Sequence, residues 1–147
     1  MANQVTVTWQ EGMHFEGLAS GHTVQMDVPP PNGQNLGVGP MTLVLVALGG
    51  CTAMDVVHIL QKERQDVTGV TVQVRGEKAS DYPMVYTDIE VVYQVRGRDL
   101  ARPAVEHAVH LSETKYCSVG IMLGKTARFT TRIEIEQDTT PRPAVSG

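Results

Sequence analysis

Two cysteines, Cys51 and Cys117, are the residues of this chain best suited to covalent chemistry. They lie far apart in the sequence, but two such thiols that meet in a fold can support an exchange cycle. One thiolate attacks an electrophilic oxygen and becomes a sulfenic acid, and the second thiol captures that acid as a disulfide. The capture protects the first sulfur from irreversible overoxidation. The two residues therefore predict a redox-active dithiol pair.

The sequence around each cysteine differs. Cys51 follows two glycines in an apolar stretch, where an unreactive cysteine often simply fills space, so a structural role stays open for it. Cys117 lies in the polar segment SETKYCSVG, a setting that favours access to solvent. Lys115 would favour the thiolate of Cys117 if it came close, and Glu113 would oppose it.

Two polar residues follow Cys51 on the same predicted helix. His58 lies seven residues further on, about 10 Å along the helix axis, which is outside the reach of direct proton transfer. Asp55 lies four residues further on, and its charge would raise the pKa of the thiol. We therefore expect Asp55 to serve a salt bridge or another subunit.

Metal and nucleotide chemistry have little support. Five histidines are present, including His107 and His110 one helical turn apart, but no CxxC or HExxH spacing occurs. We predict no metal site and interpret these two histidines as solvated residues on a helix face. No P-loop or GxGxxG fingerprint is present, and we predict no cofactor.

The rest of the chain predicts the elements that must position the cysteines. Alternating apolar residues indicate about three strands between residues 5 and 28, and proline and glycine make residues 29–40 a loop. A long helix is expected from Pro40 to about residue 65, and a hairpin with strands near residues 67–74 and 87–97 follows. A second helix capped by Asp99 and a last strand at residues 126–136 complete an α+β fold, in which a mainly antiparallel sheet packs on helices.

Length and local composition refine this picture. With 147 residues, 41% of them hydrophobic, the chain suits one domain over residues 1–138 and a flexible C-terminal tail over residues 139–147. The pair Gly49-Gly50 weakens the central helix, which suggests a close backbone approach there. The non-ionic stretch from Met41 to Met54 is shorter than the roughly 20 residues that a bilayer span requires, so we predict a buried helix.

The charge of the chain and its first residues limit the kinds of partner and the cellular location that we expect. The formal net charge is −4 and the basic residues are scattered, which argues against nucleic acid and an anionic membrane. The first residues alternate like a strand and lack the pattern of a signal peptide, so we expect a cytoplasmic protein. In a reducing cytosol, pairing of two cysteines would be transient and chemical rather than structural.

Two segments, GPMTLVLVALGGCTAMDVV and LSETKYCSV, resemble the paired cysteine motifs of the OsmC/Ohr superfamily of osmotically inducible and organic hydroperoxide resistance proteins. The resemblance covers nearly the whole chain and is closest to the YhfA-like branch. It implies an intertwined OsmC-like homodimer with active sites at the subunit interface, and a thiol peroxidase that acts on organic hydroperoxides. By position, Cys51 would be the peroxidatic residue and Cys117 the resolving one.

The sequence departs from the family pattern at two places. In well-studied members, an arginine from the N-terminal strands and a glutamate early in the central helix orient the thiolate. Here no arginine or lysine precedes Lys62, and Pro40-Met41-Thr42 stands where the glutamate is expected. His22 and Thr42 are candidates for substitute roles by position, although structural roles are favoured for both.

These observations lead to one main hypothesis and two alternatives. The main hypothesis is a dimeric thiol peroxidase in which Cys51 attacks the peroxide, Cys117 closes the disulfide, and an unidentified cellular dithiol reduces it. The missing arginine and glutamate favour, as the first alternative, a noncatalytic module that senses oxidants or binds a small hydrophobic ligand. The second alternative is a structural protein with inert buried thiols.

Overall fold

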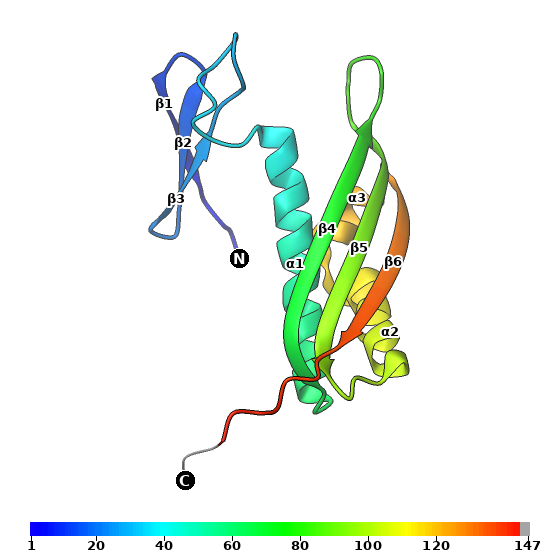
Figure 1. Cartoon of the computed structure of the whole chain (residues 1–147). Helices are drawn as coiled ribbons and strands as arrows, with labels where there is room; N and C mark the ends of the chain where they lie inside the picture. Colours follow the sequence, from blue (N-terminus) through cyan, green and yellow to red (C-terminus); the bar gives the residue numbers. More distant parts are fainter. Residues whose placement is uncertain (145–147) are drawn as a thin grey trace. The chain divides into compact units, whose positions relative to one another are not determined.

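In the computed structural model, which describes residues 1–144, the first three strands form an antiparallel sheet of their own (Figure 1). They are β1 (Thr6–Glu11), β2 (His14–Ala19) and β3 (His22–Met26), joined in sequence order as a meander. The predicted set of three N-terminal strands is confirmed.

The register of this sheet gives it one apolar face. Trp9 pairs with Phe15, and Phe15 pairs with Met26, so these side chains point to the same side. Val7 and Val24 both pair with Gly17 and join them on that side. Several of these apolar side chains are nevertheless exposed, among them Val7, Trp9 and Val24. Nothing within the N-terminal sheet itself therefore buries its apolar face.

The predicted central helix is present as α1 (Pro40–Lys62). Its buried residues, Leu48, Thr52, Val56 and Leu60, recur every four positions and form a single stripe. By length and composition alone, α1 is also long and apolar enough to cross a membrane, a property that core helices of other proteins share. The stripe indicates the face that packs against the rest of its unit.

The second sheet contains β4 (Asp66–Lys78), β5 (Tyr86–Arg98) and β6 (Arg128–Gln137), with β5 in the centre. β4 and β5 form the predicted antiparallel hairpin, whereas β6 runs parallel to β5. A parallel neighbour requires a crossover connection, and here three helical segments supply it: α2 (Arg102–Leu111), the five-residue π-helix η1 (Ser112–Tyr116) and α3 (Ser118–Leu123).

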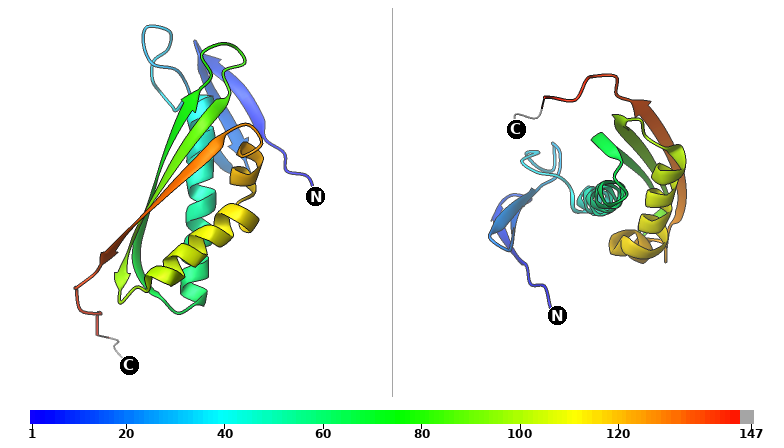
Figure 2. Two further views of the ribbon diagram at one scale, coloured as in Figure 1. Left: turned by 90° about the vertical axis from the view of Figure 1, so that its right-hand side faces the viewer. Right: turned by 90° about the horizontal axis from the view of Figure 1, so that it is seen from below.

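The helices of this unit lie on one face of the second sheet (Figure 2). Buried side chains of the central strand, including Ile89, Val91, Tyr93 and Val95, form the core together with the stripe of α1. Val105, Ala108 and Val109 of α2 complete it. The fold is therefore mixed α+β, as the sequence predicts, with its core between β5 and the helices.

One local prediction is wrong, and a second has no counterpart within the described residues. Asp99 does not cap α2; it has a φ of 52° and lies in the turn after β5, and the N-cap is Ala101 without a side-chain hydrogen bond. Within the described residues, no close backbone approach occurs at the glycine pair. A Cβ added at Gly49 would meet Val74 at 3.4 Å, an ordinary contact, and one added at Gly50 would meet no described atom within 4 Å.

The chain divides into two compact units, one from Met1 to Val44 and one from Leu45 onward, and α1 belongs to both. The single domain over residues 1–138 stays a prediction, and so does the flexible tail, of which residues 145–147 lie outside the described residues. Within residues 139–144, the Thr140 carbonyl accepts a hydrogen bond from Arg98 at 2.7 Å. Arg142 pairs with Asp66 at 2.8 Å.

Candidate active site

The structure brings the two cysteines together. Cys51 lies in the middle of α1, and Cys117 lies between η1 and α3; both are free thiols. The pKa of Cys117 is raised to about 12. Burial is the largest cause, and a hydrogen bond with the Cys51 thiol is the second. The two sulfur groups are thus near enough to interact directly, which is the geometric requirement of the predicted exchange cycle. The catalytic roles of the two residues stay predictions.

The expected solvent access of Cys117 is wrong. Its exposed fraction is 1%, although Lys115, Tyr116 and Ser118 around it are exposed. The polar segment places those neighbours in water, while Cys117 turns inward as the N-cap of α3. There its Sγ accepts a hydrogen bond from the backbone N–H of Gly120 at 3.3 Å. The sequence shows the polarity of a segment, but it does not show which residue of the segment points inward.

The structure shows where the charged neighbours of Cys117 lie. Lys115 lies over the ring of Tyr116, with Nζ 5.1 Å from the ring centroid. Among the carboxylates, Asp55 contributes to the raised pKa of Cys117. The sequence predicts that Asp55 serves a salt bridge or another subunit. No salt bridge of Asp55 is found within the described part of the chain, and its carboxylate accepts a hydrogen bond from Ser112 Oγ at 2.9 Å. The role toward another subunit stays a prediction.

This hydrogen bond begins a chain of buried hydroxyl groups. Thr52 Oγ1 lies 2.7 Å from Ser112 Oγ and 2.9 Å from the Tyr93 hydroxyl, and all three residues are buried. When Ser112 donates its only hydrogen to Asp55, Thr52 donates to Ser112 and Tyr93 donates to Thr52. Burial raises the pKa of Tyr93, which is therefore a neutral donor at physiological pH. The buried polar groups of α1, β5 and η1 thus satisfy one another.

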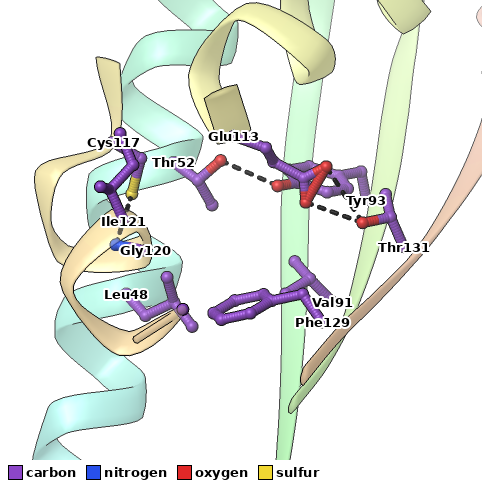
Figure 3. A pocket seen from close by; sticks show the side chains of 11 residues that line it. Leu48, Thr52, Val91, Tyr93, Glu113, Cys117, Gly120, Ile121, Phe129 and Thr131 are labelled. Atoms are coloured by element: carbon purple, nitrogen blue, oxygen red, sulfur yellow. Dashed lines mark hydrogen bonds between the residues drawn. The ribbon is translucent and has the colours of Figure 1, made fainter. Parts of the chain in front are cut away.

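A pocket of about 330 Å³ lies between α1, α3 and the second sheet (Figure 3). Thr52 and Tyr93, two members of the hydroxyl chain, form part of its wall. Cys117 forms part of its wall, whereas Cys51 is not among the described residues that line it. Glu113 faces the pocket and accepts hydrogen bonds from Thr131 at 2.7 and 3.0 Å. The remaining wall includes four apolar side chains, those of Leu48, Val91, Ile121 and Phe129.

Sequence reasoning missed this pocket and the hydroxyl chain. Serine, threonine and tyrosine are common in loops and strands, and no spacing marks the three hydroxyls as partners, because they come from three elements. In the sequence, Glu113 stands out only as a charge near Cys117. The one available signal was the Thr52 hydroxyl in an apolar helix stripe, since a buried hydroxyl requires a partner.

His107, His110 and the two candidates for the roles of the missing arginine and glutamate do not line the pocket or join the hydroxyl chain. His107 and His110 are exposed on α2, as predicted, and His107 is 3.6 Å from Glu63. Among the described residues, no group of three or more histidine, cysteine, aspartate or glutamate side chains is placed to hold a metal ion. His22 and Thr42 are exposed, and the first turn of α1 contains no acidic residue.

Comparisons with known proteins agree with this architecture. Residues 33–132 match the model of the family described as OsmC-like protein, and the chain therefore belongs to the OsmC-like family. Protein YhfA of Escherichia coli strain K12 is 45% identical over 133 residues, which cover 90% of this chain and 97% of that protein. The predicted family and branch are confirmed.

Solved structures extend the likeness. The crystal structure of a hypothetical protein from Aquifex aeolicus has a TM-score of 0.84 and 29% identity, and the match covers 94% of this chain and 98% of that one. An organic hydroperoxide resistance protein OsmC from Legionella pneumophila has a TM-score of 0.67 and 10% identity, and the match covers 91% of this chain and 97% of that one. At that identity the second likeness shows the fold alone.

Proposed function

We propose that the protein is a thiol peroxidase that reduces organic hydroperoxides through a Cys51–Cys117 dithiol–disulfide cycle. The observation that carries the proposal is the proximity of two thiols that come from distant parts of the chain, since the Cys51 thiol is near enough to raise the pKa of Cys117. Membership of the OsmC-like family supports it, as does the hydroperoxide-resistance name of the structural relative from Legionella pneumophila.

The reaction proceeds in two balanced steps. The Cys51 thiolate attacks the terminal peroxide oxygen, the O–O bond breaks, and the alkoxide leaves as an alcohol after taking up the proton that Cys51 released. The product is Cys51 sulfenic acid. Cys117 then attacks that sulfur, the disulfide forms, and the sulfenic hydroxyl leaves as water with the proton of Cys117. A cellular dithiol exchanges with the disulfide and restores both thiols.

The different surroundings of the two thiols support this division of roles. Cys51 is half-buried, so an oxidant can approach it, whereas Cys117 is buried. The raised pKa of Cys117 keeps it a protonated thiol at physiological pH, which makes it a poor first nucleophile. A protonated resolving thiol, however, carries the proton that the departing hydroxyl needs.

Mixing the anaerobically reduced protein with cumene hydroperoxide tests the proposal. The wild type should lose two thiols for each peroxide and gain an intramolecular disulfide, and added dithiol should sustain turnover. Cys117→Ser should accumulate a sulfenic acid that a dimedone probe labels at Cys51, and Cys51→Ser should not react. Retention of both thiols in the wild type would rule out the proposed cycle.

We further propose that the working form is a cytoplasmic homodimer. The exposed apolar face of the N-terminal sheet supports association, because such a surface is unfavourable in water. A reducing cytosol would return the pair to the dithiol state between turnovers. Light scattering of the purified protein measures the dimer directly.

A noncatalytic sensing role is the second candidate. It is favoured by the absence of any arginine or lysine before Lys62 and of any acidic residue in the first turn of α1. A sensor oxidises once and an enzyme cycles with added dithiol. Comparing the rate of the first oxidation with steady-state turnover therefore separates the two functions.

A further inference from the structure

The pocket beside Cys117 is not used by the proposed reaction. The attacking thiol belongs to Cys51. Cys117 is among the described residues that line the pocket, and Cys51 is not. The pocket nevertheless has the volume, about 330 Å³, of the smaller ligand sites found in proteins, which begin at roughly 300 Å³. The wall has several apolar side chains and a few polar groups that converge on one side (Figure 3).

The hydrogens of the wall's polar side chains are already committed within the protein. Thr131 donates to Glu113. Thr52 lies between the hydroxyls of Ser112 and Tyr93, and its single hydrogen serves one of them. The Tyr93 hydroxyl can donate its hydrogen to either of two partners, Thr52 or Glu113. These oxygens retain lone pairs, so a bound molecule meets hydrogen-bond acceptors.

The charge of the wall has one sign. Among the described residues that line the pocket, Glu113 is the only carboxylate, and none is a lysine, arginine or histidine. Asp55, at the other end of the hydroxyl chain, adds a second negative charge behind the wall. A carboxylate ligand would therefore meet repulsion without a counter-ion, whereas an ammonium or hydroxyl group would gain an acceptor.

We propose that this pocket is a binding site for a small apolar molecule with a neutral hydrogen-bond-donating or cationic head group. Glu113 accepts the hydrogen bond of that head group and is the residue that selects against anions. Leu48, Val91 and Phe129 contact the apolar part. Gly120 leaves room beside the thiol, since a Cβ there would stand 3.3 Å from both Cys117 Sγ and Leu48 Cδ1.

Three compounds with one cumyl skeleton test the proposal: 2-phenylpropan-2-amine, 2-phenylpropan-2-ol and 2-methyl-2-phenylpropanoate. Each is titrated into the reduced protein at neutral pH, and affinity and location are followed by the methyl resonances of Leu48, Val91 and Ile121. We expect the ammonium to bind at least about tenfold more tightly than the carboxylate, with the alcohol between them, because one favourable charge contact commonly gives such a factor.

Two variants assign the selectivity to Glu113. Glu113→Gln keeps a hydrogen-bond acceptor for Thr131 but removes the charge, and it should reduce the preference for the ammonium over the carboxylate to less than about threefold. Glu106→Gln removes an exposed carboxylate of α2 outside the pocket and should leave the preference unchanged. Equal affinities for the three compounds in the wild type, no shift of the pocket methyls, or an unchanged preference in Glu113→Gln would each overturn the proposal.

The binding test is independent of the peroxidase proposal. Cys51→Ser, which the proposed cycle makes inactive, should retain the same order of affinities, because Cys51 does not line the pocket. Loss of this order in Cys51→Ser, in a variant whose methyl spectrum is otherwise native, would count against a separate site. Failure of the wild type to react with peroxide would leave the binding result unaffected.

Discussion

The two three-stranded sheets of this protein use apolar residues in opposite ways. In the second sheet, β5 is covered by helices, and its side chains from Ile89 to Val95 are largely buried. In the first sheet, Val7, Trp9 and Val24 occupy one face and are exposed. The second sheet has its own core, whereas the first has apolar residues without a core.

The reactive groups and the surface proposed for dimer formation therefore belong to different units of the protein. The thiol pair, the hydroxyl chain and the pocket all lie in the unit that begins at Leu45. That unit can hold buried polar groups because a packed core surrounds them. The N-terminal sheet presents its apolar face for another surface, and we expect its stability to depend on what covers that face.

The largest effect is expected in the core of the second unit. Leu60 has an exposed fraction of 0%, so Leu60→Ala should reduce the free energy of unfolding by about 2–5 kcal/mol through lost burial and a cavity. Leu18, in the first sheet, has an exposed fraction of 48%, and Leu18→Ala should cost less than about 1 kcal/mol. Urea unfolding followed by circular dichroism measures both. Equal losses would contradict the contrast between the sheets.

One buried group in each unit should make stability depend on pH, Asp27 at the acid end of the scale and Cys117 at the alkaline end. Although burial opposes its ionisation, hydrogen bonds from the backbone N–H groups of Leu36, Val28 and Gln34 lower the pKa of Asp27 below its usual value. Its contribution to stability is therefore present above the ordinary pKa of about 3.8 and is lost as the pH falls. Burial raises the pKa of Cys117 to about 12, so its contribution is present below about pH 9 and is lost as the pH rises toward 12.

Unfolding of the reduced protein between pH 2 and pH 12 measures both contributions. Asp27→Asn should flatten the acid limb of the stability curve and Cys117→Ala the alkaline limb, each without changing the other. An alkaline limb that is identical in Cys117→Ala and in the wild type would show that ionisation of this thiol does not limit stability there. An effect of Asp27→Asn on the alkaline limb, or of Cys117→Ala on the acid limb, would contradict the assignment of these two groups.

The sequence predicts those parts of this fold that depend on local pattern. Alternation specifies the strands, and the apolar run specifies α1, because both signals lie within a few neighbouring residues. The orientation of Cys117 and the parallel pairing of β6 depend instead on the crossover through α2, η1 and α3, which brings distant segments together. The cysteine pair is predictable only because thiols are rare in this chain; Thr52, Ser112 and Tyr93 carry no comparable signal.

A smaller effect is expected for association. Val7→Asp places a charge on the apolar face of the first sheet and should weaken the proposed homodimer by at least about tenfold, because the carboxylate would lose its hydration in the interface. Thr8→Asp is the matched control, since residue 8 points to the opposite, polar face of the same strand. Sedimentation at several protein concentrations measures the dissociation constants. Equal effects of the two variants would place the interface elsewhere.

The smallest predicted effect concerns α1, the element that both units share. Gly50 has no described atom within 4 Å of an added Cβ, so Gly50→Ala should stabilise the protein by about 0.5–1 kcal/mol through the lower conformational freedom of alanine in the unfolded chain. Gly49→Ala is the control, with a smaller gain expected because its new methyl group lies 3.4 Å from Val74. Thermal unfolding at protein concentrations above and below the dissociation constant of the dimer shows whether solvent or a partner subunit covers Gly50. A gain in both states means that water covers Gly50, whereas a gain in the monomer and a loss in the dimer means that a partner subunit packs against α1 at this glycine.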